Sequence, residues 1–268
     1  MLSRISLWLG KLSVGRKLTL IYLLDLCAVI YVSGILIHEK FLAIDFARKE
    51  IVGATYTEVV RDDLMGAFVV PSRPAAVPQS AKQSLQTVRG AYDEDLKTAD
   101  LSARFSDALR EVAGTTEQQE SNLLAVGRDL LTTIGNQSNL ILDPDLDSYY
   151  VMSLTVLRFP ELLQVLHATH KFMQSRKDRV ADQSQTVQML ALVGRLDAVV
   201  SGIDADYGQA WLAGTPQLKT ALDASRNALL EQSRAFSSVV QGVASAPPTP
   251  AQVIELNAAY QSALTALS

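Results

Sequence analysis

Apolar residues recur at spacings of three and four positions along four long segments of the chain. The stripes extend from Leu123 to Leu140, from Met152 to Met173, from Met189 to Ala210 and from Leu218 to Val243. A repeat of this kind keeps one stripe of each helix against a partner, which gives left-handed, near-parallel packing in a bundle. Because no comparable two-residue alternation runs along the sequence, a sheet is not expected. The pattern predicts an all-α protein built from long helices.

Proline and glycine indicate where these helices should end. Thr215 is expected to cap a helix that begins at Pro216, and Thr249 is expected to cap the final helix. The predicted breaks fall at residues 71–78, 143–144, 214–216 and 246–250. We therefore expect six main helices, at about residues 38–70, 78–113, 116–142, 147–176, 179–212 and 216–268, the last of them interrupted.

A continuous apolar run precedes the striped segments. Residues 18–37 contain one charged residue, Asp25. At about 1.5 Å of rise per residue, a helix of this length crosses a hydrocarbon core of about 30 Å. A cleaved signal peptide is the alternative, but the run is longer than the apolar part of such peptides, and no clear small-x-small cleavage site follows it. We therefore expect residues 18–37 to form a transmembrane helix.

Charge predicts how this helix is oriented. Four basic residues and no acidic residue precede it, and basic flanks stay in the cytoplasm. Residues 1–17 should therefore be cytoplasmic, and residues 38–268 should lie in the periplasm, beyond the inner membrane. Of the 28 Asp and Glu residues only Asp25 precedes residue 38, so the exported part is acidic. Nucleic acid is not an expected partner, because its binding requires a basic surface.

Two stretches of the chain carry recognisable motifs. Residues 136–160 have the sequence Asn-Gln-Ser-Asn-Leu-Ile-Leu-Asp-Pro-Asp-Leu-Asp-Ser-Tyr-Tyr-Val-Met-Ser-Leu-Thr-Val-Leu-Arg-Phe-Pro. Residues 46–56 have a Phe-Ala-x-Lys-Glu-x-x-Gly-x-x-Tyr pattern just after the apolar run. Both resemble, in the same order, signatures in the extracytoplasmic sensor regions of bacterial methyl-accepting chemotaxis proteins and related transmembrane sensor kinases. Val151 and Ser153 depart from the Leu and Asp that the family usually has after its tyrosine pair.

The resemblance implies a ligand-sensing domain of a chemoreceptor-type signal transducer. In that family a small molecule binds between the helices of a homodimer, and a small displacement of the last helix passes through the membrane. Two stacked four-helix bundles and one elongated four-helix bundle both agree with the length. The resemblance also implies a signalling or interface role for Lys49, Glu50 and Tyr56. Because no second span precedes Ser268, we expect a second span and an output module to follow in a longer receptor.

Alternating acidic residues lie at the centre of the longer motif. Asp143, Asp145 and Asp147 have the spacing of the first three ligands of an EF-hand calcium loop. That loop also needs Gly at its sixth position and Glu at its twelfth, where this chain has Ser148 and Leu154. An EF-hand is therefore not expected. We interpret the aspartates either as helix punctuation, with Asp147 as an N-cap, or as part of a ligand site.

Further candidate ligand-binding residues lie on both sides of this cluster. Tyr149 and Tyr150 open the next helix, where adjacent positions point about 100° apart, so at most one of them faces the bundle centre. Asn139 is expected within the preceding helix, on an otherwise apolar face, where it fixes the register or contacts a ligand. Arg158 is interpreted either as a clamp for an anion or as a solvated residue. Pro160 should bend the helix that carries Arg158.

Two other classes of function stay open. His167 and His170 have a spacing that can hold a metal or haem, although no cysteine supports such a site. The bundle could instead be a structural or partner-binding protein of the cell envelope. Catalysis is not supported, because the chain has no nucleophile elbow, phosphate-binding glycine loop or His-Glu-x-x-His motif. We expect no enzyme activity, no resident metal and no cofactor.

Overall fold

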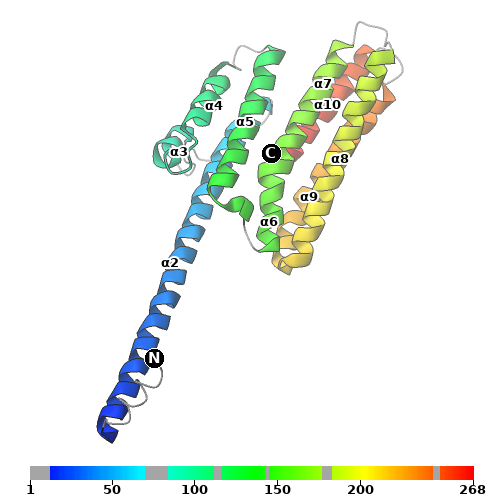
Figure 1. The fold of residues 1–268 in the computed structure, drawn as a ribbon. Helices are drawn as coiled ribbons and strands as arrows, with labels where there is room; N and C mark the ends of the chain where they lie inside the picture. Colours follow the sequence, from blue (N-terminus) through cyan, green and yellow to red (C-terminus); the bar gives the residue numbers. More distant parts are fainter. Residues whose placement is uncertain (1–12, 70–83, 112–115, 143–144, 177–182, 244–247) are drawn as a thin grey trace. The chain divides into compact units, whose positions relative to one another are not determined.

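The computed structural model describes residues 13–69, 84–111, 116–142, 145–176, 183–243 and 248–268, and no strand occurs among them (Figure 1). The α-helices are α2 (Val14–Phe68), α3 (Leu85–Tyr92), α4 (Ala99–Glu111), α5 (Glu117–Gln137), α6 (Leu146–Met152), α7 (Phe159–Ser175), α8 (Gln183–Ala213), α9 (Pro216–Gly242) and α10 (Pro250–Leu267). A 3-10 helix, η2 (Leu140–Leu142), follows α5, and a π-helix, η3 (Ser153–Arg158), joins α6 to α7. The prediction of an all-α protein is confirmed.

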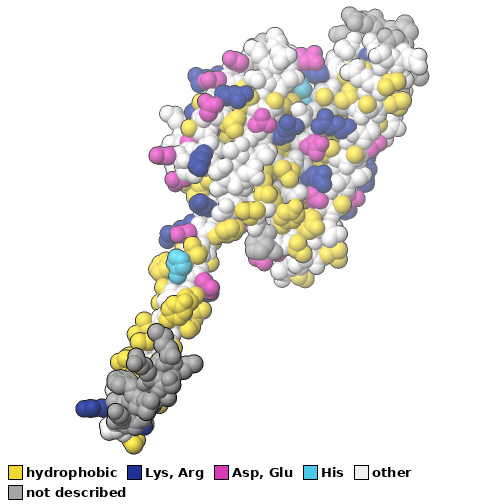
Figure 2. All heavy atoms as spheres, in the orientation of Figure 1, with side chains coloured by type: hydrophobic (Ala, Val, Ile, Leu, Met, Phe, Trp, Pro, Cys, Tyr) yellow, Lys and Arg dark blue, Asp and Glu magenta, His cyan; other side chains and the backbone are white. Residues whose placement is uncertain are grey.

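The chain divides into two compact units, and the boundary between them lies within α2. The first unit ends at Lys49, and the second spans Glu50–Ser268. In the first unit, large apolar side chains are exposed along α2 from Leu18 to Ile44. Figure 2 shows these side chains along the helix, whereas basic and acidic side chains are mixed over the visible face of the second unit.

Two helices of the described residues are long and apolar enough to span a membrane. In α8, 33% of the most apolar window is buried, because this helix packs against α6, α7 and α9. In α2, none of the corresponding window is buried. Of these two helices, α2 therefore has its apolar surface exposed, whereas α8 contributes part of its apolar surface to the core.

Most predicted helices agree with the observed ones, with two differences. The expected helix at 78–113 is divided into α3 and α4, because a turn intervenes in which Lys97 has a φ of 52°. The expected helix at 116–142 ends at Gln137, followed by η2. The predicted breaks at residues 71–78 and 143–144 lie outside the described residues.

Side-chain caps fix several helix starts. Thr215 accepts a hydrogen bond from the Leu218 backbone N–H at the start of α9, as predicted. Thr249 and Gln252 form a capping box at α10, in which each side chain bonds the other residue's backbone N–H. Thr116 does the same with Gln119 at α5. These caps satisfy backbone donors that a helix start leaves without partners.

The core of the second unit lies between long, near-parallel helices. In Figure 1, α7, α8, α9 and α10 run side by side, and α10 packs against both α9 and α7. α5 packs against α7 and α4. The predicted stripes supply the interior: Leu130, Leu166, Leu196, Ile203 and Phe236 have no exposed surface. Burial of each such side chain contributes about 1.5–3 kcal/mol to stability.

The helix around Pro160 changes its hydrogen-bond pattern. The Phe159 N–H donates to the Leu154 carbonyl, five residues back, at the end of η3. Proline has no N–H to donate and excludes the carbonyl four residues back, so a regular α-helical ladder cannot continue through it. The disturbance that the sequence predicts at this position is therefore a π-helical segment, which accommodates the proline without ending the helix.

Candidate functional site

The two sequence motifs meet inside the second unit. Gly53 of α2 is buried against the end of α5, where Ser138 has no exposed surface. A Cβ atom at position 53 would lie 2.3 Å from the Ser138 Cβ and 3.0 Å from Leu140 Cδ1. No side chain fits in that space, so the glycine of the shorter motif is required by the contact with the longer one.

The sequence predicted that Asn139 lies within a helix, and this prediction is wrong. Asn139 follows Ser138, the C-cap residue of α5. Its φ is 66°, a left-handed conformation that asparagine tolerates better than most residues. Its carbonyl accepts a hydrogen bond from the Leu142 N–H at 2.8 Å, which starts η2. Asn139 therefore ends α5 and turns the chain, and its half-buried side chain belongs to this turn.

The candidate signalling residues have different environments. Lys49 is exposed and Glu50 is half-buried. Tyr56 is fully buried, and its hydroxyl donates to Asp93 Oδ1 at 2.7 Å. Burial is the main cause that raises the pKa of Tyr56, and the hydrogen bond to Asp93 adds to it.

Asp93 connects Tyr56 to the turn between α3 and α4. Its Oδ1 also accepts from the Thr98 hydroxyl at 2.8 Å, and its Oδ2 accepts from the Ser102 hydroxyl. Arg89 Nε lies 3.5 Å from Oδ2. Tyr56 therefore fixes α2 to the α3–α4 turn through a carboxylate whose other acceptor positions are occupied.

The aspartates of the longer motif lie at the start of α6. Asp145 occupies the N-cap position, and Asp147, expected as the N-cap, is the second residue of the helix. Asp147 Oδ1 accepts from the Ser148 N–H at 2.9 Å. Carboxylates in a first turn favour the positive end of the helix dipole. Asp143 lies outside the described residues.

Neither tyrosine that follows these aspartates is buried. Tyr149 is 36% exposed and Tyr150 is half-buried. Their rings contact each other edge to face, with centroids 5.3 Å apart. The expectation that at most one of them faces the bundle centre agrees with this arrangement.

Arg158 binds a buried carboxylate of the protein itself. Its Nε donates to Asp206 Oδ2 at 2.9 Å, and the Ser153 hydroxyl donates to the same oxygen at 2.9 Å. In an α-helix, residues five positions apart point about 140° apart. The wider turn of η3 brings Ser153 and Arg158 to the same face, so both reach Asp206 of α8. The positive charge that the sequence suggested for an anion is therefore already compensated.

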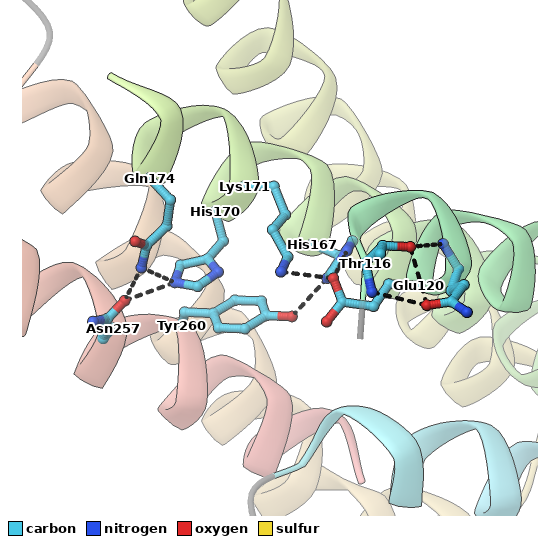
Figure 3. A network of polar contacts seen from close by, with 9 residues as sticks. Thr116, Glu120, His167, His170, Lys171, Gln174, Asn257 and Tyr260 are labelled. Carbon is cyan, nitrogen blue, oxygen red and sulfur yellow. Dashed lines mark hydrogen bonds and ion pairs between the residues drawn. The ribbon is translucent and has the colours of Figure 1, made fainter. Parts of the chain in front are cut away.

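A second buried polar cluster lies between α5, α7 and α10 (Figure 3). Lys171 Nζ is 2.6 Å from Glu120 Oε2, and His167 Nε2 is 3.5 Å from the same oxygen. The Tyr260 hydroxyl and His167 Nδ1 are hydrogen-bonded at 3.2 Å. The side chain of Glu120 is only 14% exposed, so its charge depends on these neighbours.

His170 continues this cluster along α7. Its ring stacks on Tyr260 with centroids 4.0 Å apart and planes 5° apart, and its Nε2–H donates to Asn257 Oδ1 at 2.8 Å. Gln174 Nε2 donates to the same oxygen at 2.6 Å. Polar side chains of α7 and α10 thus interlock inside an otherwise apolar bundle.

Burial keeps both histidines neutral at ordinary pH. It lowers the pKa of His167 to about 4, opposed by Glu120 and assisted by Lys171 and His170. Burial likewise lowers the pKa of His170, opposed by the hydrogen bond to Asn257. Within the described residues, no group of three or more His, Cys, Asp or Glu side chains is arranged to hold a metal ion.

A cleft of about 510 Å³ opens beside this cluster, within the range of small-molecule sites. Its walls come from the start of α5, the outer face of α7 and the start of α8. The lining residues are Glu117, Ser121, Leu124, Gln164, His167, Ala168, Lys171, Phe172, Ser175, Gln185, Gln188 and Leu192. None of the residues selected from the two motifs lines it.

Sequence reasoning missed this cleft for a physical reason. Gln164, Lys171 and Ser175 recur at helical spacing beside the apolar stripe of α7, a pattern typical of a solvated face. The cleft arises because α5 and α8 pack on different sides of α7, with the small Ala168 exposed between them. The periodicity of α7 alone does not show where its neighbours lie.

Comparison of the chain with protein-family models, with curated proteins and with solved structures found no match. The fold and the cleft define a class: an all-α protein with an exposed apolar helix and a ligand-sized cleft in its helical unit.

Proposed function

We propose that the chain is the membrane anchor and extracytoplasmic sensor domain of a bacterial chemoreceptor-type signal transducer. The observation that carries this proposal is the cleft of about 510 Å³ between α5, α7 and α8. A ligand that touches three helices can favour one packing of them over another, and this differential binding is what a transmembrane signal requires. The family resemblance of the two motifs supports the same function.

The proposed anchor is the N-terminal part of α2. Residues 18–37 have the length of a membrane span, and their apolar side chains are exposed along the helix. Arg16 and Lys17 lie directly before this span, on the side that the positive-inside rule assigns to the cytoplasm. In this proposal the unit Glu50–Ser268 lies in the periplasm, and the receptor acts as a homodimer, as the resemblance implies.

A thermal-shift screen of the full chain in detergent micelles tests ligand sensing. The panel contains organic acids, amino acids, polyamines, inorganic anions and neutral sugars, and unfolding is followed by circular dichroism. We expect one class to raise the Tm with increasing concentration, because a ligand that binds the folded state stabilises it. Absence of a shift for every class, with cooperative unfolding, would contradict ligand sensing and favour a spacer in the envelope.

Cysteine labelling tests the proposed orientation. In a Cys27→Ala background, Ser225→Cys places a thiol on the exposed surface of α9, and Ser13→Cys places one before the span. A membrane-impermeant maleimide applied to intact cells with a permeabilised outer membrane should label position 225 and not position 13. The reverse labelling would contradict the proposed topology, and lysed cells, in which both positions react, provide the control.

A further inference from the structure

The charges at the cleft are already compensated by the protein. Lys171, which lines the cleft, lies 2.6 Å from the carboxylate of Glu120. The Glu120 side chain is 14% exposed, so it has little water to replace its cation. An anionic ligand that took Lys171 would leave a buried carboxylate uncompensated, which costs more than an exposed ion pair contributes.

The histidine in the cleft supplies no additional positive charge. His167 is 4% exposed, and burial lowers its pKa to about 4. Glu117 contributes a carboxylate to the lining, at the start of α5. Among the described lining residues, positive charge in excess of the Glu120 pair is therefore lacking at neutral pH. Arg128 is not part of the lining, and its guanidinium donates to the Gln164 carbonyl.

Neutral hydrogen-bonding groups dominate the rest of the polar lining. Gln164, Gln188 and Ser121 supply them, and Ser175, whose hydroxyl donates to the Phe172 carbonyl at 2.8 Å, adds an acceptor. Gln185 also lines the cleft and interacts with the protein itself. Amide and hydroxyl groups both donate and accept hydrogen bonds, which suits a ligand whose own groups do both. The Gln164 carbonyl accepts from Arg128 at 3.1 Å, so the group of this side chain that can bind an acceptor on a ligand is its NH₂.

The remaining lining is apolar and spans all three helices. Leu124 comes from α5, Ala168 and Phe172 come from α7, and Leu192 comes from α8. Such a surface packs against the C–H face of a ring, while the polar groups bind the hydroxyls at its edge. The combination is typical of sites for molecules that carry hydroxyl groups on a carbon ring.

We propose that this cleft binds a neutral polyhydroxylated ring, a monosaccharide or a cyclic polyol. The inference rests on the proposed sensor function and specifies its ligand class. A neutral ligand in the cleft does not require the Lys171–Glu120 pair to break.

Matched compounds separate the neutral class from the anionic one. Binding of D-glucose, D-galactose and myo-inositol to the full chain in detergent micelles is compared with that of D-glucuronate, D-galacturonate and an inositol monophosphate. Isothermal titration and Tm shifts give the affinities. We expect at least one neutral compound to bind at least tenfold more tightly than its charged counterpart. Equal or tighter binding of the charged compounds overturns the neutral class and leaves ligand sensing intact.

Substitutions on the cleft wall locate the site. Ala168→Trp fills the cleft at an exposed position and should abolish binding of the neutral compound. Ala224→Trp makes the same change on the exposed surface of α9 and should leave binding unchanged. Gln188→Leu removes a hydrogen-bonding side chain and should raise Kd by about tenfold.

Three outcomes overturn the inference in distinguishable ways. Binding that survives Ala168→Trp, in a variant with an unchanged helical spectrum, places the ligand elsewhere and leaves the sensor proposal standing. Binding of amino acids or organic acids in place of neutral compounds overturns the ligand class alone. Failure of every compound in the broader screen overturns the ligand class and the sensor function together.

Discussion

Two buried carboxylates in the second unit have similar partners and different surroundings. Asp206 accepts hydrogen bonds from Arg158 and Ser153, and Glu120 contacts Lys171 and His167. The carboxylates are almost equally buried, at 12% and 14% side-chain exposure. None of the Asp206 cluster lines the cleft, whereas both partners of Glu120 do.

The difference shows that a cation near a carboxylate does not by itself identify a binding site. At Asp206, the donors come from the π-helical turn and the arrangement joins η3 to α8. At Glu120, the same kind of pair borders open space between three helices. We call the Asp206 group, with Arg158 and Ser153, the closed cluster, and the Glu120 group, with Lys171 and His167, the open cluster. We therefore expect substitutions at the closed cluster to change stability alone, and substitutions around the open cluster to change ligand binding as well.

The largest expected effect is at the closed cluster. Asp206→Ala leaves the buried Ser153 hydroxyl and the partly exposed Arg158 guanidinium without their acceptor, and should lower the free energy of unfolding by about 2–3 kcal/mol. Chemical denaturation followed by circular dichroism measures this change. Asp107→Ala, which breaks the exposed pair with Arg110, is the control and should change stability by less than about 0.5 kcal/mol. Equal losses in the two variants would show that the Asp206 cluster is not structural.

The open cluster should make stability depend on pH. Because the pKa of His167 is lowered to about 4 in the folded state, the unfolded chain binds the proton first as pH falls below about 6.5. The contribution of His167 to the free energy of unfolding is therefore fully present above pH 6.5 and declines as the pH falls toward 4. Between pH 8 and pH 5 it should contribute a loss of about 2 kcal/mol.

His167→Gln tests this contribution by difference, since the carboxylates and His170 titrate in both proteins. The pH dependence of unfolding should be shallower in the variant by about 2 kcal/mol over that interval. His38→Gln, at an exposed position of α2, is the matched control and should keep the wild-type slope. Parallel curves for wild type and His167→Gln would contradict the buried, neutral state of His167.

The contact between the two motifs, Gly53 against Ser138, lies away from the residues that line the cleft. Gly53→Ala forces a methyl group against Ser138 and should destabilise the protein by about 1–2 kcal/mol, which thermal denaturation detects. Gly66→Ala, on the same helix with open space around it, should instead stabilise by about 0.5–1 kcal/mol. Combining Gly53→Ala with Ser138→Gly should recover part of the loss, and additive losses would exclude the steric explanation.

Lys171 either only compensates the charge of Glu120 or also contacts the ligand, and two substitutions distinguish these roles. Lys171→Met should destabilise the protein, and Glu120→Gln in the same chain should restore most of the loss, with a coupling of about 1 kcal/mol. The double variant should still bind the neutral ligand, because the pair is removed as a unit. Loss of binding in the double variant, with stability restored, would mean that Lys171 contacts the ligand directly.

The apolar stripes predicted the helices because local periodicity determines helix formation and the face that each helix buries. Asn139 was placed wrongly, because α5 ends at Gln137 and Asn139 has a left-handed φ, whereas the apolar spacing continues to Leu140. Arg158 and Asp206 are 48 residues apart, and their pairing depends on how η3 packs on α8. The cleft depends on three helices at once, so no single segment predicts it.

The smallest expected effects are at the residues that the sequence favoured for ligand binding. Tyr149 is partly exposed and contacts Tyr150 at the start of α6, away from the residues that line the cleft. Tyr149→Ala should change stability by less than about 0.5 kcal/mol, as for most surface positions, and should leave ligand affinity unchanged. Titration of the ligand found in the screen measures the affinity, with Ala168→Trp as the variant that loses it. If Tyr149→Ala weakened binding and Ala168→Trp did not, the ligand site would lie at the motif and the open cluster would be structural like the closed one.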